Sequence, residues 1–318
     1  MHHLRRETLK TVITHKTVLL LLAVTSVTAE NAKRGKCDGD IFHHVYYDKI
    51  IVLQDFGKPN NLVMHKYSNI LFFSHTVQNG RNMDFRIMAC EISNKECFDV
   101  KGIPGGFAVA YDPSNDDIYF GGHDGIYRYN FLTKSAEFFA EEGKSIWGLS
   151  IRRNFYYIEY PTQKLFVYQD DRFVHVAEAM TIEIDQFYVS KRKDKFFSNK
   201  TALYKVSKDE KDALVLNDEI LVRQITEDNY GDIYFCASDG IYMEDHPYHR
   251  LKKVASIDEA YGLTFDENDH IIYSNRDTIY KLIPSNNSEM CYELYAFDNK
   301  EENNARRLSL LSKLSKLH

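Results

Sequence analysis

The sequence predicts an all-β fold, a six-bladed β-propeller with four-stranded blades that is closed by an N-terminal strand. Two repeated motifs and an aromatic-rich composition support this prediction. The first motif is the short apolar run Gly125–Tyr129, which recurs at intervals of 38 or 39 residues. Its aligned apolar positions are Ile126, Leu165, Leu203, Ile241 and Ile279. A period near 40 residues, built from short strands, is typical of propellers with one blade per repeat.

The second motif is a run of apolar and aromatic residues bounded by polar turns. Its six copies begin at Asn69, Asp117, Asn154, Lys195, Asp232 and His270. Continuous apolar runs of this kind suit strands that are buried on both faces between stacked blades. The first two copies lie 48 residues apart, so we expect an insertion in the first blade, over Val77–Asp84.

Composition agrees with a β fold and excludes two classes of partner. Aromatic residues make up 14% of the chain, with 22 Tyr and 20 Phe but one Trp, and Tyr and Phe favour pleated, packed strands. The formal net charge is −6. Because nucleic acids and anionic membranes attract basic surfaces, we expect neither as a partner.

The N-terminal residues 1–29 resemble a secretory signal peptide. Basic residues precede the apolar run Val18–Val24, and the small residues Val27–Ala29 offer a cleavage site. An uncleaved membrane anchor is the alternative, but the apolar run is too short to span a bilayer. We therefore expect a secreted, extracellular protein, and a monomer.

The rest of the chain divides into three predicted parts. Residues 30–57 form an N-terminal segment that contains the ring-closing strand, Ile41–Gln54, and residues 58–298 form the six blades. Residues 299–318 form a basic Leu/Lys tail, with leucines at every third position from Leu308. This tail is either a short amphipathic helix or a frayed end, because so short a helix is marginal alone.

Five cysteines fit an oxidising compartment. Cys90 and Cys97 flank a predicted hairpin turn in the first blade, so a local disulfide is expected. Cys37 precedes the first blade and Cys291 is expected in the last, where a disulfide between them would lock the closing strand. Cys236 lies in a buried strand and would remain a free thiol. Four cysteines allow three pairings, so the connectivity stays open.

Two glycosylation sequons follow the predicted strands, at Asn199 and Asn286. In a secreted chain both are candidate sites, so we expect a glycoprotein. No Cys/His spacing is typical of structural zinc.

A candidate ligand site follows from the repeat. The innermost strand of a propeller blade lines the channel, and its first residues face the channel mouth. Counting backward from the second motif identifies one equivalent position per blade, namely Asn60, Phe107, Trp147, Asp185, Arg223 and Tyr261. Three aromatic rings, an acid and an arginine suit a flat aromatic ligand with a charged group, because rings stack and guanidinium binds carboxylate in bidentate fashion.

A structural interpretation of the same ring stays open. Bulky residues at these positions plug the channel of any propeller, and Asp185 and Arg223 would then be a structural ion pair. A register error of one residue would also turn each side chain to the other side. Loops expected on the same face contain His75, His123, Asp124, Glu159, Tyr160, Asn199, Asp239, Asn275 and Arg276.

The sequence argues against catalysis. Only Asn60 and Asp185 of the ring offer oxygen ligands, whereas hard cations bind six or more oxygens, so a metal site would need neighbours such as Asn61 or Gln186. The chain contains no Gly-x-Ser-x-Gly nucleophile motif, no P-loop and no dinucleotide-binding glycine pattern. We therefore expect no enzyme activity, no metal and no cofactor.

Three stretches resemble a known family. They are Gly105–Ala108 (Gly-Gly-Phe-Ala), Phe120–Tyr129 and Ser145–Leu149, and they follow a secretory leader and Cys37. Together they resemble the insect ommochrome-binding proteins, over nearly the whole mature chain. The resemblance implies a soluble hemolymph protein that carries tryptophan-derived phenoxazinone pigments, whose flat rings and amino-acid groups suit the predicted ring.

The sequence therefore favours a secreted carrier that binds a small aromatic pigment in the channel mouth without transforming it. One alternative is a metal-dependent propeller of the lactonase or esterase kind. A second alternative is an extracellular propeller that binds a protein through its outer face or its loops.

Overall fold

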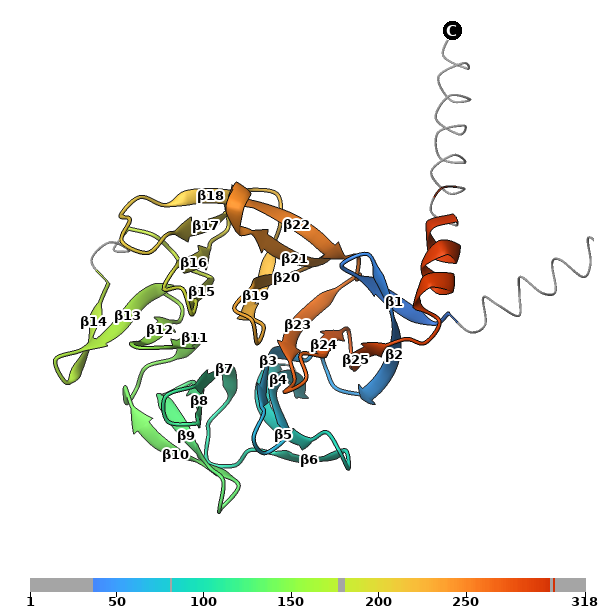
Figure 1. The fold of residues 1–318 in the computed structure, drawn as a ribbon. Coiled ribbons are helices and arrows are strands. Elements are labelled where there is room, and N and C mark those ends of the chain that lie inside the picture. The colour runs from blue at the N-terminus through green and yellow to red at the C-terminus, as the bar shows by residue number, and fades with distance from the viewer. Residues whose placement is uncertain (1–36, 81, 177–180, 298–299, 301–318) are drawn as a thin grey trace, which may run out of the picture. The chain divides into compact units, whose positions relative to one another are not determined.

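The computed structural model describes residues 37–80, 82–176, 181–297 and 300. The chain divides into a propeller unit, residues 49–283, and a terminal unit that contains the described residues on either side. The propeller unit consists of six antiparallel sheets arranged in a ring (Figure 1). The predicted six-bladed β-propeller is therefore confirmed.

Each blade has four antiparallel strands, and its first strand contacts the first strands of the neighbouring blades around the axis. Blade 1 contains β3 (Asn60–His65), β4 (Ile70–Asn79), β5 (Asn82–Glu91) and β6 (Glu96–Asp99). Blade 2 contains β7 (Gly106–Asp112), β8 (Asp117–Gly122), β9 (Ile126–Asn130) and β10 (Ser135–Ala140). Blade 3 contains β11 (Ile146–Ile151), β12 (Phe155–Glu159), β13 (Lys164–Gln169) and β14 (Arg172–His175).

Blade 4 contains β15 (Gln186–Val189), β16 (Lys195–Ser198), β17 (Leu203–Val206) and β18 (Leu214–Asn217). Blade 5 contains β19 (Val222–Glu227), β20 (Ile233–Ala237), β21 (Gly240–Asp245) and β22 (Arg250–Ala255), with the 3₁₀ turn η2 (His246–Tyr248) before the last strand. Blade 6 contains β23 (Ala260–Phe265), β24 (Ile271–Asn275) and β25 (Thr278–Pro284), and β2 (Val45–Leu53) is its fourth strand.

The second strands of the blades carry the aromatic core. Phe72 of β4 and Phe120 of β8 are fully buried and their rings meet between blades 1 and 2, with centroids 5.8 Å apart. Phe196 and Phe235 pack in the same way between blades 4 and 5. Aromatic side chains fill the space between blades because each blade needs apolar contacts on both faces. This explains why the second motif is continuously apolar.

The N-terminal strand closes the ring, as the sequence predicts. Within the propeller unit, Val52 and Leu53 of β2 pack with Ile272 and Ile279 of blade 6. The N–H of Phe56, just after β2, donates to the main-chain oxygen of Asp277 at 3.1 Å. Closure removes the unpaired sheet edge that the last blade would otherwise expose.

The terminal unit contains the strand β1 (Gly39–Phe42), which pairs with the first half of β2, and a helical segment over residues 288–297. The disulfide Cys37–Cys291 lies in this unit. The predicted pairing is confirmed, but Cys291 lies on the helical segment and not in the last blade. The expected blade region, 58–298, runs past the last strand because β2 already completes blade 6 and β25 ends at Pro284.

Blade 1 contains the predicted insertion as a lengthened hairpin. β4 and β5 are ten residues each, and Val77 pairs with Asp84 near the tip. The second predicted disulfide, Cys90–Cys97, joins β5 to β6, and Cys236 is a buried free thiol. The predicted signal peptide and most of the predicted tail lie outside the described residues. In the described part of the chain, no helix is long and apolar enough to cross a membrane.

Candidate functional site

Four of the predicted ring residues occupy β-bulges. The ladder between the first and second strands skips Phe107 in β7, Trp147 in β11, Arg223 in β19 and Tyr261 in β23. A bulged residue is left out of the ladder, and the bulge re-aims its side chain. The repeat therefore places these four side chains at one level, where the inner strands begin.

The other two positions differ. Asp185 precedes β15, and its N–H donates to the main-chain oxygen of Ser198 at 2.8 Å. In blade 1 Asn60 pairs with Ser74, and the bulge begins at Asn61. Val63 pairs with Phe72 as Val109 pairs with Phe120, so Asn61, not Asn60, is the equivalent of Phe107. Nδ2 of Asn61 donates to the main-chain oxygen of Phe107 at 2.9 Å.

An aromatic row runs along the channel mouth over blades 1 to 3. The indole of Trp147 stacks on Phe107 with centroids 4.0 Å apart and planes 14° apart. Phe85 of β5 contacts Phe107 edge-on, with ring centroids 4.7 Å apart, and the Tyr160 ring lies 6.0 Å from that of Trp147. Phe107 and Trp147 are half-buried and Tyr160 is 55% exposed. The row therefore presents aromatic surface to solvent.

The charged ring residues lie in the next blades and are oriented by the main chain. Nη1 of Arg223 donates to the main-chain oxygen of Ala260 at 2.8 Å, and its guanidinium lies 4.1 Å from the centre of the Tyr261 ring. The Asp185 carboxylate accepts a hydrogen bond from Gln163, and burial raises the pKa of Asp185. Nε1 of Trp147 donates to the main-chain oxygen of Asp185 at 3.2 Å. In the described residues no ion pair joins Asp185 to Arg223.

Below the ring, residues of all six inner strands line a cavity of about 240 Å³. Gln224, which sequence reasoning did not single out, crosses from β19 to β3. Its Oε1 accepts from the N–H groups of Leu62 and Leu263 at 3.1 Å, and its Nε2 donates to the main-chain oxygen of Leu62 at 2.8 Å. A Cβ at Gly262 would lie 2.5 Å from Leu62 and 3.1 Å from Oε1 of Gln224, so a glycine leaves room for this bridge.

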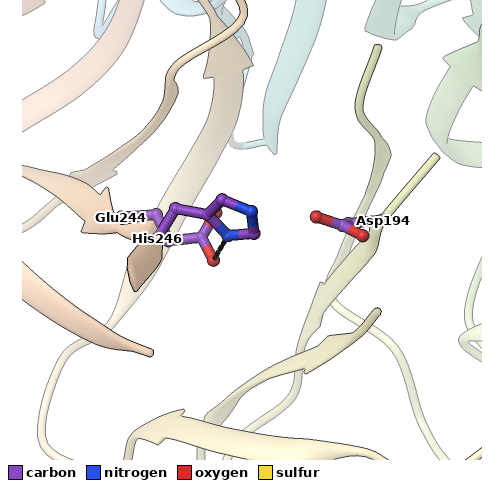
Figure 2. Close-up of side chains that lie close together, drawn as sticks. All are labelled: Asp194, Glu244 and His246. Carbon is purple, nitrogen blue, oxygen red and sulfur yellow. Dashed lines mark ion pairs between the residues drawn. The ribbon is translucent and has the colours of Figure 1, made fainter. Parts of the chain in front are cut away.

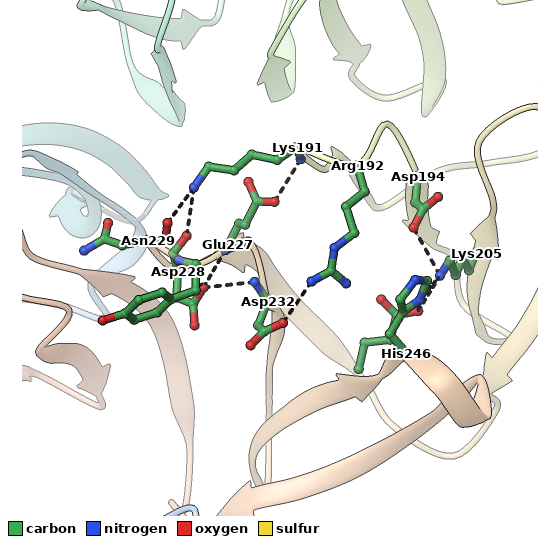
Figure 3. Close-up of polar contacts among 12 residues, drawn as sticks. Lys191, Arg192, Asp194, Lys205, Glu227, Asp228, Asn229, Asp232 and His246 are labelled. Atoms are coloured by element: carbon green, nitrogen blue, oxygen red, sulfur yellow. Dashed lines mark hydrogen bonds and ion pairs between the residues drawn. The ribbon is translucent and has the colours of Figure 1, made fainter.

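A second polar group lies between blades 4 and 5, away from the channel. Oxygen or nitrogen atoms of Asp194, Glu244 and His246 lie within 4.8 Å of one another, which is the spacing of a metal site (Figure 2). The ammonium of Lys205, which is fully buried, lies among them (Figure 3). Its Nζ is 2.5 Å from Glu244, 3.2 Å from Asp194 and 3.1 Å from His246. The Lys205 ammonium therefore occupies the position between these three side chains that a metal ion would take.

The mouth does not match the ligand set of a hard divalent cation. At the ring level Asn61, Asp185 and Tyr261 are the residues with side-chain oxygens, and Asp185 is the one carboxylate among them. Such cations bind six or more oxygens, with carboxylates prominent among them. The arrangement suits stacking and a charged hydrogen bond better than metal chemistry.

The predicted glycosylation sites are both in loops. Asn286 is exposed, whereas Oδ1 of Asn199 accepts hydrogen bonds from the N–H and hydroxyl of Thr201 at 2.9 and 2.7 Å. Modification of either residue stays a prediction.

Comparison with solved structures identifies enzymes and other propellers of the same fold. A gluconolactonase from Xanthomonas campestris superposes with a TM-score of 0.61 at 12% identity, over 77% of this chain and 95% of the enzyme. A putative gluconolactonase gives 0.56 at 10% identity, over 74% and 91%. Virginiamycin B lyase from Staphylococcus aureus gives 0.51 at 10% identity, over 75% and 99%. Identities this low establish the shared fold alone.

Sequence comparison identifies a relative with a binding function. No protein-family model matches the chain. The ommochrome-binding protein of Manduca sexta is 28% identical over 247 residues, which cover 75% of this chain and 88% of the relative. This similarity confirms the resemblance to the insect ommochrome-binding proteins that the three sequence motifs predict.

Proposed function

We propose that this protein is a secreted, hemolymph-type carrier that binds an ommochrome-type aromatic pigment in the mouth of the propeller channel. The proposal includes no chemical step and no cofactor. The similarity to an ommochrome-binding protein supports the class of ligand. Two disulfides support an oxidising compartment.

The stack of Phe107 on Trp147 is the observation that carries the proposal. Both rings belong to bulged residues, both are half-buried, and Phe85 and Tyr160 extend them into a row. A flat polycyclic ligand gains dispersion and stacking energy on such a surface. The rings are already ordered by one another, so binding costs little side-chain entropy.

Arg223 is the proposed partner of a ligand carboxylate. Its guanidinium lies on the Tyr261 ring and gives one N–H to a main-chain oxygen, so other N–H groups stay available. Asp185, whose carboxylate is held by Gln163, is the proposed partner of the ligand's amine. These two residues would set the orientation of the pigment, and stacking would supply most of the affinity.

The lactonase alternative is less well supported by the same residues. The superposed gluconolactonases share the fold at 10–12% identity, and the ring level of this chain offers one carboxylate, that of Asp185. Calcium-dependent turnover of simple lactones would reverse this preference.

Trp147 provides the test, because it is the single tryptophan of the chain. Titration of the purified full chain with an ommochrome should quench Trp147 fluorescence in a saturable, one-to-one manner. In the Arg223→Met variant the quenching should remain but require about tenfold more pigment, since one charged hydrogen bond is lost.

Arg250→Met is a matched control, because Arg250 carries an exposed guanidinium that lies over the Tyr248 ring of blade 5. Its pigment affinity should equal that of the unmodified protein. Trp147 fluorescence that does not change when the pigment is added would contradict the carrier proposal.

A further inference from the structure

Three cationic side chains from three blades meet where the inner strands end. Lys66 follows β3, Arg152 follows β11, and Lys191 lies two residues after β15. Lys66 donates to Oδ1 of Asn229. Nζ of Lys191 donates to the main-chain oxygen of the same residue at 2.9 Å (Figure 3). Two ammonium groups therefore contact a single neutral residue.

The carboxylates beside these ammonium groups are already engaged. Glu227 is 2% exposed, forms an ion pair with Arg152 and accepts the main-chain N–H of Lys191 at 2.8 Å. Oδ1 of Asp228 accepts three main-chain N–H groups of the following turn, at 2.9 Å each. In the described residues no carboxylate lies within ion-pair distance of Lys66 or Lys191. Burial is the largest influence and lowers the pKa of Lys66; the charges of Asp269, Asp266 and Asp228 oppose this, and the charge of Lys191 adds to it.

These cations border the channel cavity. Lys66, Arg152 and Lys191 line it together with apolar and aromatic side chains that include Tyr111, Phe187 and Tyr188. Its volume of about 240 Å³ is below the range of drug-sized pockets, roughly 300–1,000 Å³. The cavity therefore suits a ligand of about one aromatic ring.

We propose that this end of the channel binds a small aromatic carboxylate. Its carboxylate group would lie between Lys66 and Lys191, and its ring would enter the cavity against Tyr111, Phe187 and Tyr188. A bound carboxylate would place a negative charge beside the two ammonium groups, which now donate to neutral oxygens of Asn229. The carboxylate position is distinct from the pigment mouth, because five residues separate Asn61 from Lys66 and Trp147 from Arg152, about 16 Å along an inner strand. The cavity between the two ends also reaches Asn61.

Calorimetric titration of the full chain at low ionic strength tests the proposal, with benzoate as the probe and benzyl alcohol as its uncharged counterpart. Benzoate should bind saturably, once per chain, and more weakly as salt is added, whereas benzyl alcohol should not saturate. Lys191→Met should weaken benzoate binding about tenfold, because a charged hydrogen bond is lost. Lys66→Met should act in the same direction.

Two controls separate this site from general charge effects and from the pigment site. Lys200→Met removes a 76% exposed lysine elsewhere and should leave benzoate binding unchanged. Saturating benzoate should not alter the quenching of Trp147 by an ommochrome. Lys191 is exposed, so its variant tests the site even where Lys66→Met fails to fold.

Three results would overturn the proposal. They are no saturable benzoate binding, equal benzoate affinity in Lys191→Met, and binding of inorganic phosphate without binding of benzoate. The last result would identify an inorganic anion site without an aromatic specificity.

Discussion

The indole of Trp147 lies flat against Phe107, 4.0 Å away, although the two residues come from different blades and each is omitted from its own ladder. The contact links blades 2 and 3 at the channel mouth. It also means that each ring holds the other in place before any ligand arrives.

Phe107→Ala should weaken pigment binding while leaving Trp147 as the reporter. An aromatic pair contributes about 0.5–1.5 kcal/mol beyond its buried area, so we expect a loss of affinity of roughly threefold to tenfold. Fluorescence titration measures it. Tyr67→Ala is the control, since Tyr67 is 90% exposed in the turn after β3, at the opposite end of the inner strand. An equal loss in both variants would contradict a specific role for Phe107.

Gln224→Leu should destabilise the propeller by about 3 kcal/mol. Leucine has a similar size but leaves two buried N–H groups and one carbonyl without the partner that Gln224 supplies, and an unsatisfied buried group costs about 1–3 kcal/mol. Urea unfolding measures the difference. Gln78→Leu, at an exposed position of β4, should change the midpoint little.

The contribution of Asp266 to the free energy of unfolding should depend on pH. Burial opposes ionisation, but hydrogen bonds from Lys281 and His270 outweigh it and lower the pKa of Asp266 below its usual 3.8. A carboxyl with a lowered folded-state pKa stabilises the fold above the unfolded pKa, and the benefit is lost as pH falls through the folded value.

Asp266→Asn should therefore cost about 2 kcal/mol at pH 7 and progressively less below pH 3.8. Urea unfolding at several pH values measures this difference. The exposed Asp258→Asn variant should show no such trend. A pH-independent cost at Asp266 would mean that its charge is not the cause.

Lys205→Ala should destabilise the protein and create a metal site. Removing one partner of a buried ion cluster costs about 3–5 kcal/mol, because Asp194 and Glu244 are left buried without the ammonium. The vacated space is bordered by two carboxylates and His246, which suit Zn²⁺. Zinc should raise the melting temperature of this variant and not that of the unmodified protein. If zinc does not change the melting temperature of Lys205→Ala, the prediction of a metal site is wrong.

Cys236 should be unreactive until the protein unfolds. The thiol is completely buried, and burial raises its pKa to about 12. Since the thiolate is the reactive species, a disulfide-exchange reagent at pH 8 should label no thiol in the folded protein and one thiol in denaturant. Rapid labelling without denaturant would show that blade 5 opens locally.

The fold was predictable because the same apolar strand motif recurs in every blade. Each blade repeats an apolar strand such as Ile118–Gly121 at nearly constant spacing, so five of the six ring positions follow from counting. Blade 1 has a different spacing, since its hairpin is longer, and the count there reached Asn60 where the register gives Asn61. A local insertion is enough to displace a prediction that rests on periodicity.

The interior of the channel was not predictable in the same way. Gln224 bonds to Leu62, 162 residues earlier in the chain, and Lys66 meets Asn229 across a similar distance in sequence. Such partners share neither a motif nor a period, because each depends on how the closed ring brings turns together. The sequence shows their residue types but no signal that they meet.

The bulges at the channel mouth have an evolutionary consequence. Because the ladder bypasses Phe107, Trp147, Arg223 and Tyr261, we expect substitutions there to change contacts between blades and leave the strand pairing within each blade in place. Each of these four blades then contributes one side chain whose exchange leaves its own strand ladder intact. A single scaffold of this kind can acquire a new ligand preference one blade at a time.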